Sequence, residues 1–136
     1  ELKRRLEAGQ GGPVLQVRAR RVGPFPHRIR DVGVIHDLGP HDIDIMRYLF
    51  GDPDKITALT RHDPRTQFAH IDGISQYTFL YANELMATSL DDVWAWPGEG
   101  TEKDIYIKWR VEGTDGLVYV VDSSDEARLT ESTEEL

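Results

Sequence analysis

The chain has 136 residues, no cysteine and a formal net charge of −8. This length predicts one domain with a real core and excludes a large two-domain enzyme. The lack of cysteine excludes a disulfide framework, a thiolate nucleophile and a Cys-based zinc site, and the acidic balance argues against a nucleic-acid partner. No apolar run approaches the roughly 18 residues of a membrane span. We therefore expect a cytoplasmic domain without a membrane or nucleic-acid partner.

The chain begins inside a helical pattern. Leu2 and Leu6 are spaced four apart, and Gly9 ends the segment. Glu1 is not a methionine and does not resemble a helix cap. We therefore expect residues 1–136 to be a single domain that was cut from a longer protein.

A strand is predicted for residues 14–22, which read VLQVRARRV. Alternation places Leu15, Val17 and Ala19 on one face of this strand. Gln16, Arg18 and Arg20 form a polar row on the other face. Either this row is a solvated or interface surface, or it binds an anion.

A loop stiffened by Pro24 and Pro26 follows this strand and carries Arg28 and Arg30. Two guanidinium groups beside a cluster of His and Asp residues suit the binding of a phosphate or carboxylate. The alternative is a connecting loop with solvated charges. Because loops carry binding residues disproportionately often, both interpretations stay open.

The segment from Asp31 to Gly51 holds the densest group of reactive side chains. Its sequence is DVGVIHDLGPHDIDIMRYLFG, with two histidines and three aspartates within residues 36–44. A helix is predicted here, because Pro40 is tolerated in a first turn and acidic side chains suit the helix N-terminus. Gly51 is suited to end it, and Pro53 prevents its continuation. We expect Tyr48 and Phe50 to lie in the core.

His41 and Asp37 are four residues apart, so helical geometry would place them on one face. Imidazole can take up and return a proton near neutral pH, and a carboxylate can orient the ring or hold a substrate hydroxyl. Asp44 is placed to hydrogen-bond the imidazole, whereas Asp42 is expected to be a solvated acid of the first turn. The alternative for all of them is that they only favour the helix N-terminus.

A metal site built from His36, Asp37, His41 and Asp44 is a further possibility, because His and carboxylate ligands suit zinc or iron. Adjacent residues such as His36 and Asp37 diverge on either a helix or a strand, however. We therefore expect no metal site.

The second half of the chain is predicted to form strands. These cover Lys55 to His62, Ile71 to Tyr81, Leu85 to Trp94, Lys103 to Glu112 and Leu117 to Val121. Asn83 is expected to take the left-handed conformation in one turn, and Asp115-Gly116 to form a second hairpin. The fold class is therefore α+β, with an open, mostly antiparallel (mixed) sheet of about six strands and helices on one face.

The segment GVIHDLGPHDIDIMRYLFG resembles the signature of the Gfo/Idh/MocA oxidoreductases, G-x-x-x-D-x-G-x-H-x-x-D followed by an apolar helix and a glycine. Asp37, Gly39, His41 and Asp44 are in register with it. The segment Val111 to Gly116 resembles a later strand–GT-x-G–strand element of the family. The resemblance covers nearly the whole chain, but only the family's C-terminal domain, which binds substrate and forms oligomers. Glu84 departs from the glycine that relatives often carry in that hairpin.

This resemblance implies that the full-length protein is an NAD(P)-dependent dehydrogenase. It would oxidise a sugar, nucleotide-sugar or cyclitol hydroxyl, with His41 as the acid/base and Asp37 as the substrate-binding or orienting carboxylate. Arg28, Arg30 and Asp44 would contact the substrate. NAD or NADP would be bound mainly by an N-terminal Rossmann domain that this sequence lacks, so the fragment alone is expected to be inactive, and no cofactor-binding residue is assigned.

The rival hypothesis is a non-catalytic assembly module. An antiparallel sheet with one uncovered apolar face needs a partner, and the family's sheets typically pack face to face between subunits. Ile105, Ile107 and Trp109 alternate with polar residues and suit such a face. A homodimer or homotetramer formed through the sheet is therefore expected under either hypothesis.

Overall fold

The computed structural model describes residues 1–23, 31–65, 71–92 and 106–122. Its helices are α1 (Leu2–Glu7), α2 (Val34–Asp37) and α3 (Gly39–Phe50). Its strands are β1 (Val14–Val22), β2 (Lys55–His62), β3 (Asp72–Leu80), β4 (Met86–Asp92), β5 (Tyr106–Gly113) and β6 (Gly116–Asp122).

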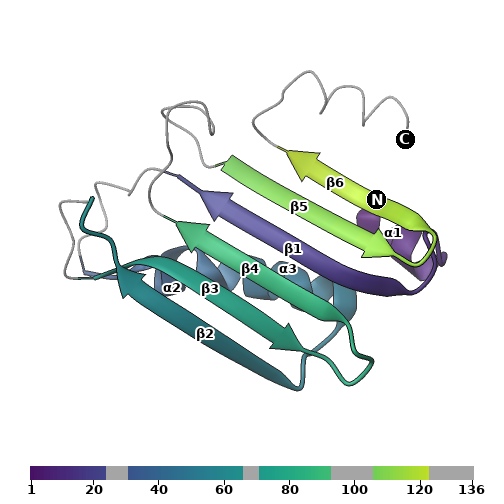
Figure 1. Ribbon diagram of the computed structural model, residues 1–136, viewed down its shortest axis with the longest axis horizontal. Coiled ribbons are helices and arrows are strands. Elements are labelled where there is room, and N and C mark those ends of the chain that lie inside the picture. The colour runs from purple at the N-terminus through teal and green to yellow at the C-terminus, as the bar shows by residue number, and fades with distance from the viewer. Residues whose placement is uncertain (24–30, 66–70, 93–105, 123–136) are drawn as a thin grey trace.

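The six strands form one sheet in the order β2-β3-β4-β1-β5-β6. Strands β1 and β4 are parallel, and every other neighbouring pair is antiparallel. Helices α2 and α3 lie behind the sheet in Figure 1, and the opposite face carries no helix in the described part of the chain. This confirms the predicted α+β class and the mixed, mostly antiparallel sheet with helices on one face.

Three buried rows of side chains cross β1, β4 and β3 on the helical side of the sheet. The apolar row is Val17, Ala87 and Phe79, the mixed row is Ala19, Ser89 and Tyr77, and the polar row is Arg21, Asp91 and Ser75. All nine side chains are buried. The interior therefore changes from hydrocarbon to polar groups along the strands.

Helix α3 has the boundaries that its sequence predicts. Pro40 lies in the first turn, and Gly51 has a φ of 82°, a left-handed conformation that favours glycine. Met46 is buried against the sheet, and Phe50 is half-buried. The expectation that Tyr48 lies in the core is wrong, because its ring is 62% exposed. The Lys3 ammonium lies 4.1 Å from the centre of that ring.

Two predictions about strand faces are also wrong. Leu15 is 53% exposed, although alternation placed it with Val17, because the register of β1 shifts between Val14 and Gln16. Trp109 is buried in the core rather than on an uncovered face, and Ile107 packs against the same core. The apolar side chains of β5 therefore support the helical side of the sheet.

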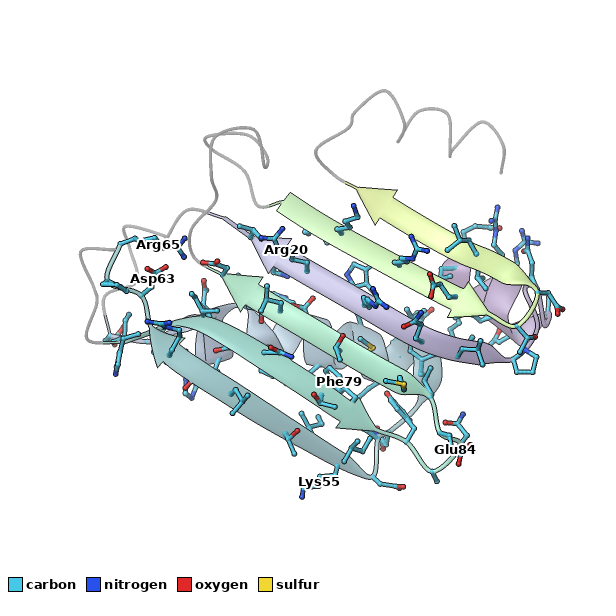
Figure 2. All side chains as sticks on the ribbon, viewed as in Figure 1. Arg20, Lys55, Asp63, Arg65, Phe79 and Glu84 are labelled. Atoms are coloured by element: carbon cyan, nitrogen blue, oxygen red, sulfur yellow. The ribbon has the colours of Figure 1, made fainter. Side chains whose placement is uncertain are left out.

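Both hairpins form where expected, with different turn residues. In the β3–β4 turn, Glu84 rather than Asn83 takes a positive φ, of 65°. The Asn83 Oδ1 atom instead accepts a hydrogen bond from the Leu85 N–H group at 3.2 Å, which closes the turn. Figure 2 labels Glu84 at this tip. Thr114 and Asp115 form the β5–β6 turn, and Gly116 begins the next strand.

Several predictions fall on residues outside the described ranges. These are the substrate-binding arginines Arg28 and Arg30, the position of Ile105, and the ends of two predicted strands. Among the described residues, no helix has the length and apolar character needed to cross a membrane.

Candidate functional site

The signature residues occupy the junction between α2 and α3. Only Leu38 separates the two helices, and the His41 N–H group donates to the Leu38 carbonyl at 3.1 Å. His41 and Asp44 are exposed, and Asp37 is half-buried. The predicted spacing of Asp37 and His41 therefore lies along an almost continuous helical path.

The start of α2 is held by a carboxylate from the sheet. The Ile35 N–H group donates to the Asp72 Oδ2 atom at 3.1 Å, so Asp72 satisfies one of the free donors of the first turn. Gly33 precedes the helix, and a Cβ atom at this position would collide with the same carboxylate. The glycine that leads the signature is thus required by this close approach.

A second glycine of the signature lets α3 lie close to the sheet. A Cβ atom at Gly39 would lie 2.7 Å from the Tyr77 hydroxyl oxygen. The Tyr77 ring is almost completely buried, so it has little room to move away. Gly39 therefore places the first turn of α3 directly over the mixed row.

The prediction that Asp42 is solvated is wrong. Its side chain is fully buried and forms an ion pair with Arg21 of β1. The Arg21 Nη2 atom lies 3.2 Å from Asp42 Oδ1, and Nε lies 3.3 Å from Oδ2. His41, the preceding residue, is exposed, so adjacent side chains on α3 have opposite environments.

Sequence reasoning also missed Arg21 as part of the site. Strand alternation already places Arg21 on the same face as Val17 and Ala19, and this was the available signal. An arginine on a buried face requires a carboxylate partner. Nothing in the local sequence identifies Asp42, which lies 21 residues away, as that partner.

The polar and mixed rows contain buried atoms without hydrogen-bond partners. These are both Asp91 carboxylate oxygens and the hydroxyl oxygens of Ser75, Tyr77 and Ser89. Burial, reinforced by the neighbouring Asp42 carboxylate, raises the pKa of Asp91 to about 9. Burial also raises the pKa of Tyr77 above its ordinary value, with the Asp91 charge acting in the same direction. At neutral pH, Asp91 is therefore a neutral acid that can donate a hydrogen bond.

A separate ionic cluster lies where β2 and β4 end. The Asp63 carboxylate is buried and is contacted by the Arg65 guanidinium at 2.7 Å, and the same guanidinium lies 3.3 Å from Asp92. Arg65 lowers the pKa of Asp63. Figure 2 shows Asp63 and Arg65 together at this end of the sheet. The sequence suggested only a polar connection here.

No group of three or more metal-ligating side chains occurs among the residues that the structure describes. The groups that the site offers are an exposed imidazole at His41, an exposed carboxylate at Asp44 and a half-buried carboxylate at Asp37. Such groups can exchange a proton with a bound hydroxyl and hydrogen-bond to it.

The fold and this site define an α+β domain that presents a histidine and carboxylates from its single helical layer. Residues 1–119 match the family model for the GFO/IDH/MocA C-terminal domain. Because this match covers most of the 136 residues, the chain belongs to the GFO/IDH/MocA family and corresponds to its C-terminal domain.

Individual relatives agree with this assignment. Inositol 2-dehydrogenase 2 from Saccharopolyspora erythraea is 38% identical over 66 residues, which are 48% of this chain and 19% of that protein. Among solved structures, a myo-inositol dehydrogenase from Corynebacterium glutamicum has a TM-score of 0.74 at 15% identity, over 89% of this chain and 36% of its own. Levoglucosan dehydrogenase, in complex with NADH and levoglucosan, has a TM-score of 0.68 at 19% identity, over the same shares.

Because the pKa of Asp91 is raised, we expect the free energy of unfolding to depend on pH. The folded protein keeps a proton on Asp91 that the unfolded chain releases above its ordinary pKa of 3.8, so the free energy of unfolding should fall as pH rises from about 4 to about 9. Asp42, Arg21 and Tyr77 are the ionisable groups that act on Asp91. Asp91→Asn cannot titrate, so urea unfolding at a series of pH values should show a flatter dependence for this variant.

The control for this measurement is Asp54→Asn, which removes an exposed carboxylate. It should leave the pH dependence of the wild-type protein unchanged. An Asp91→Asn variant whose stability falls with pH as steeply as that of the wild type would show that Asp91 is ionised in the folded protein.

Proposed function

We propose that this domain is the C-terminal substrate-binding half of an NAD(P)-dependent oxidoreductase. Its substrate class is a sugar, nucleotide-sugar or cyclitol with a secondary hydroxyl that is oxidised to a ketone. The observation that carries this proposal is the membership of the family together with an accessible His41 in its signature helix. The chain spans only 19–36% of the relatives described above, so the activity belongs to a longer protein.

His41 is the acid/base in this proposal. Its exposed imidazole is free to accept the hydroxyl proton of the substrate, and a neutral imidazole is well suited to this near pH 7. Asp37 lies one turn earlier and is half-buried, so it can bind the same hydroxyl or orient the ring. Asp44, three residues after His41, and the loop arginines Arg28 and Arg30 contact other substrate groups.

The nicotinamide cofactor, when bound, accepts the hydride. The described residues provide proton-transfer groups but no Gly-rich strand–turn–helix that would hold a dinucleotide. These residues therefore suit a domain that completes an active site. The cofactor of that site would be held by a preceding Rossmann domain. We expect the isolated domain neither to bind NAD(H) tightly nor to turn over, and we expect the full-length protein to be cytoplasmic.

Replacing His41 tests the catalytic role. In the full-length protein, His41→Gln should lower kcat by about 10²–10⁴-fold, because the substrate hydroxyl loses its proton acceptor. The measurement is NAD(P)H formation with a panel of inositols and sugars. His36→Gln is the matched control, since His36 is also exposed and lies in the same segment. Full turnover by His41→Gln would leave only a structural role for this domain.

The open face of the sheet, which is the face opposite to α2 and α3, favours a second role in assembly. Leu59 and Met86 are 76% and 69% exposed, and Leu80, the cross-strand neighbour of Met86, is 45% exposed. The row of Gln16, Arg18 and Arg20 lies on this face, where Arg18 hydrogen-bonds to Gln16. Apolar and polar side chains are thus mixed over this face, as they are in protein interfaces. We propose that this face joins subunits in a homodimer or homotetramer.

Met86→Asp tests this interface. A buried, unpaired carboxylate in a subunit contact is costly, so the variant should dissociate in sedimentation-equilibrium experiments while the wild-type protein remains a dimer or tetramer. Tyr48→Asp adds the same charge on the helical side and should leave the mass unchanged. A monomeric wild-type protein, or a Met86→Asp variant of wild-type mass, would contradict this interface.

A further inference from the structure

The buried Arg21–Asp42 ion pair lies directly behind the signature helix. Arg21 belongs to β1, whose neighbours on both sides place it in the interior of the sheet, and Asp42 belongs to the first turn of α3. Two of the nitrogen atoms of the guanidinium lie within 3.4 Å of the carboxylate. This is the only ion pair between the sheet and a helix among the described residues.

We propose that Asp42 and Arg21 are positioning residues for His41, and that their ion pair fixes the rotation of the first turn of α3 about its axis. This inference rests on the proposed function of His41 as the acid/base. Residues 41 and 42 are neighbours on one helix, so a constraint on the Asp42 side chain is also a constraint on the direction of the imidazole.

One further contact restricts the same turn, and a buried acid lies beside the ion pair. Gly39 lies against the Tyr77 hydroxyl, so the helix cannot rotate toward β3 without a clash. Asp91 lies beside Arg21 in the polar row and beside Ser75 on its other side. A neutral Asp91 can donate to the Asp42 carboxylate, which otherwise receives hydrogen bonds only from Arg21 among the described side chains. The first turn of α3 is therefore held by groups from β1 and β3, and Asp91 of β4 lies beside the ion pair.

A purely stabilising role would be met more simply by apolar side chains. Replacing a buried ion pair by packed hydrocarbon is often neutral or stabilising, whereas the pair imposes one direction on its partners. The apolar row already anchors the C-terminal half of α3 through Met46. The polar groups are placed instead below the end of α3 that carries His41.

The experiment is a double-mutant cycle in the full-length protein, with Arg21→Gln, Asp42→Asn and the combination of the two. The single variants each leave one buried polar partner unmatched and should unfold at lower urea concentration. The combined variant removes both charges and should recover part of that stability. All three variants should nevertheless lose kcat by about 10–100-fold, because small misplacement of a catalytic group has effects of this size.

Asp63→Asn is the matched control, because Asp63 is also buried and paired with an arginine, Arg65, and neither residue belongs to α3. It should lower stability and leave kcat unchanged. If kcat of the Arg21 and Asp42 variants instead follows their stability, so that the combined variant recovers both, the positioning role is contradicted.

A second readout does not depend on turnover. The ring resonances of His41, assigned with His41→Gln, should shift in the Asp42→Asn protein and stay in place in Asp63→Asn. Unchanged His41 resonances in a folded Asp42→Asn protein would overturn the inference. A wild-type protein that oxidises no polyol with NAD or NADP would contradict the proposed function instead, and the resonances would still decide whether Asp42 positions His41.

Discussion

The buried ion pair between Arg21 and Asp42 is the constraint on which the site depends. It joins an inner strand of the sheet to the first turn of the helix that carries His41. Leaving one member of such a pair alone in the interior costs about 3–5 kcal/mol, so the pair strongly disfavours any placement of α3 that separates the two groups. A helix held only by hydrocarbon could slide or rotate by small amounts at much lower cost, since apolar contacts are not directional.

The interior of the domain is divided along its strands. The apolar row supplies the non-directional burial that keeps sheet and helix together, and its Phe79 and Val17 belong to the same buried cluster as Met46 of α3. The polar row at the other end of the strands instead fixes the orientation of α3, because the ion pair of its Arg21 with Asp42 is directional. This division places the specific contacts next to the exposed histidine, on the side of the sheet opposite to the face that we propose for the subunit contact.

Local sequence patterns predicted the positions of helices and strands but not the polar contacts in the interior. Pro40 and Gly51 marked the ends of α3. The alternation of β1 located a strand, and the Asp115-Gly116 pair located the β5–β6 hairpin. These signals depend only on neighbours in sequence. Asp42 was misjudged because its partner is brought to it only by the sheet. Glu84 in a left-handed turn, and Leu15 displaced by a register shift, likewise depend on pairing that residue patterns do not specify. The roles of Arg28 and Arg30 stay predictions.

The most direct test of the proposed role of His41 is a crystal structure of the full-length protein with NAD(P) and its polyol substrate. We predict that the substrate hydroxyl lies within hydrogen-bond distance of the His41 imidazole, about 2.6–3.2 Å, with Asp37 beside it and the Arg21–Asp42 pair intact below. A structure in which His41 faces solvent or a subunit contact, and the reacting hydroxyl is held by other residues, would contradict it.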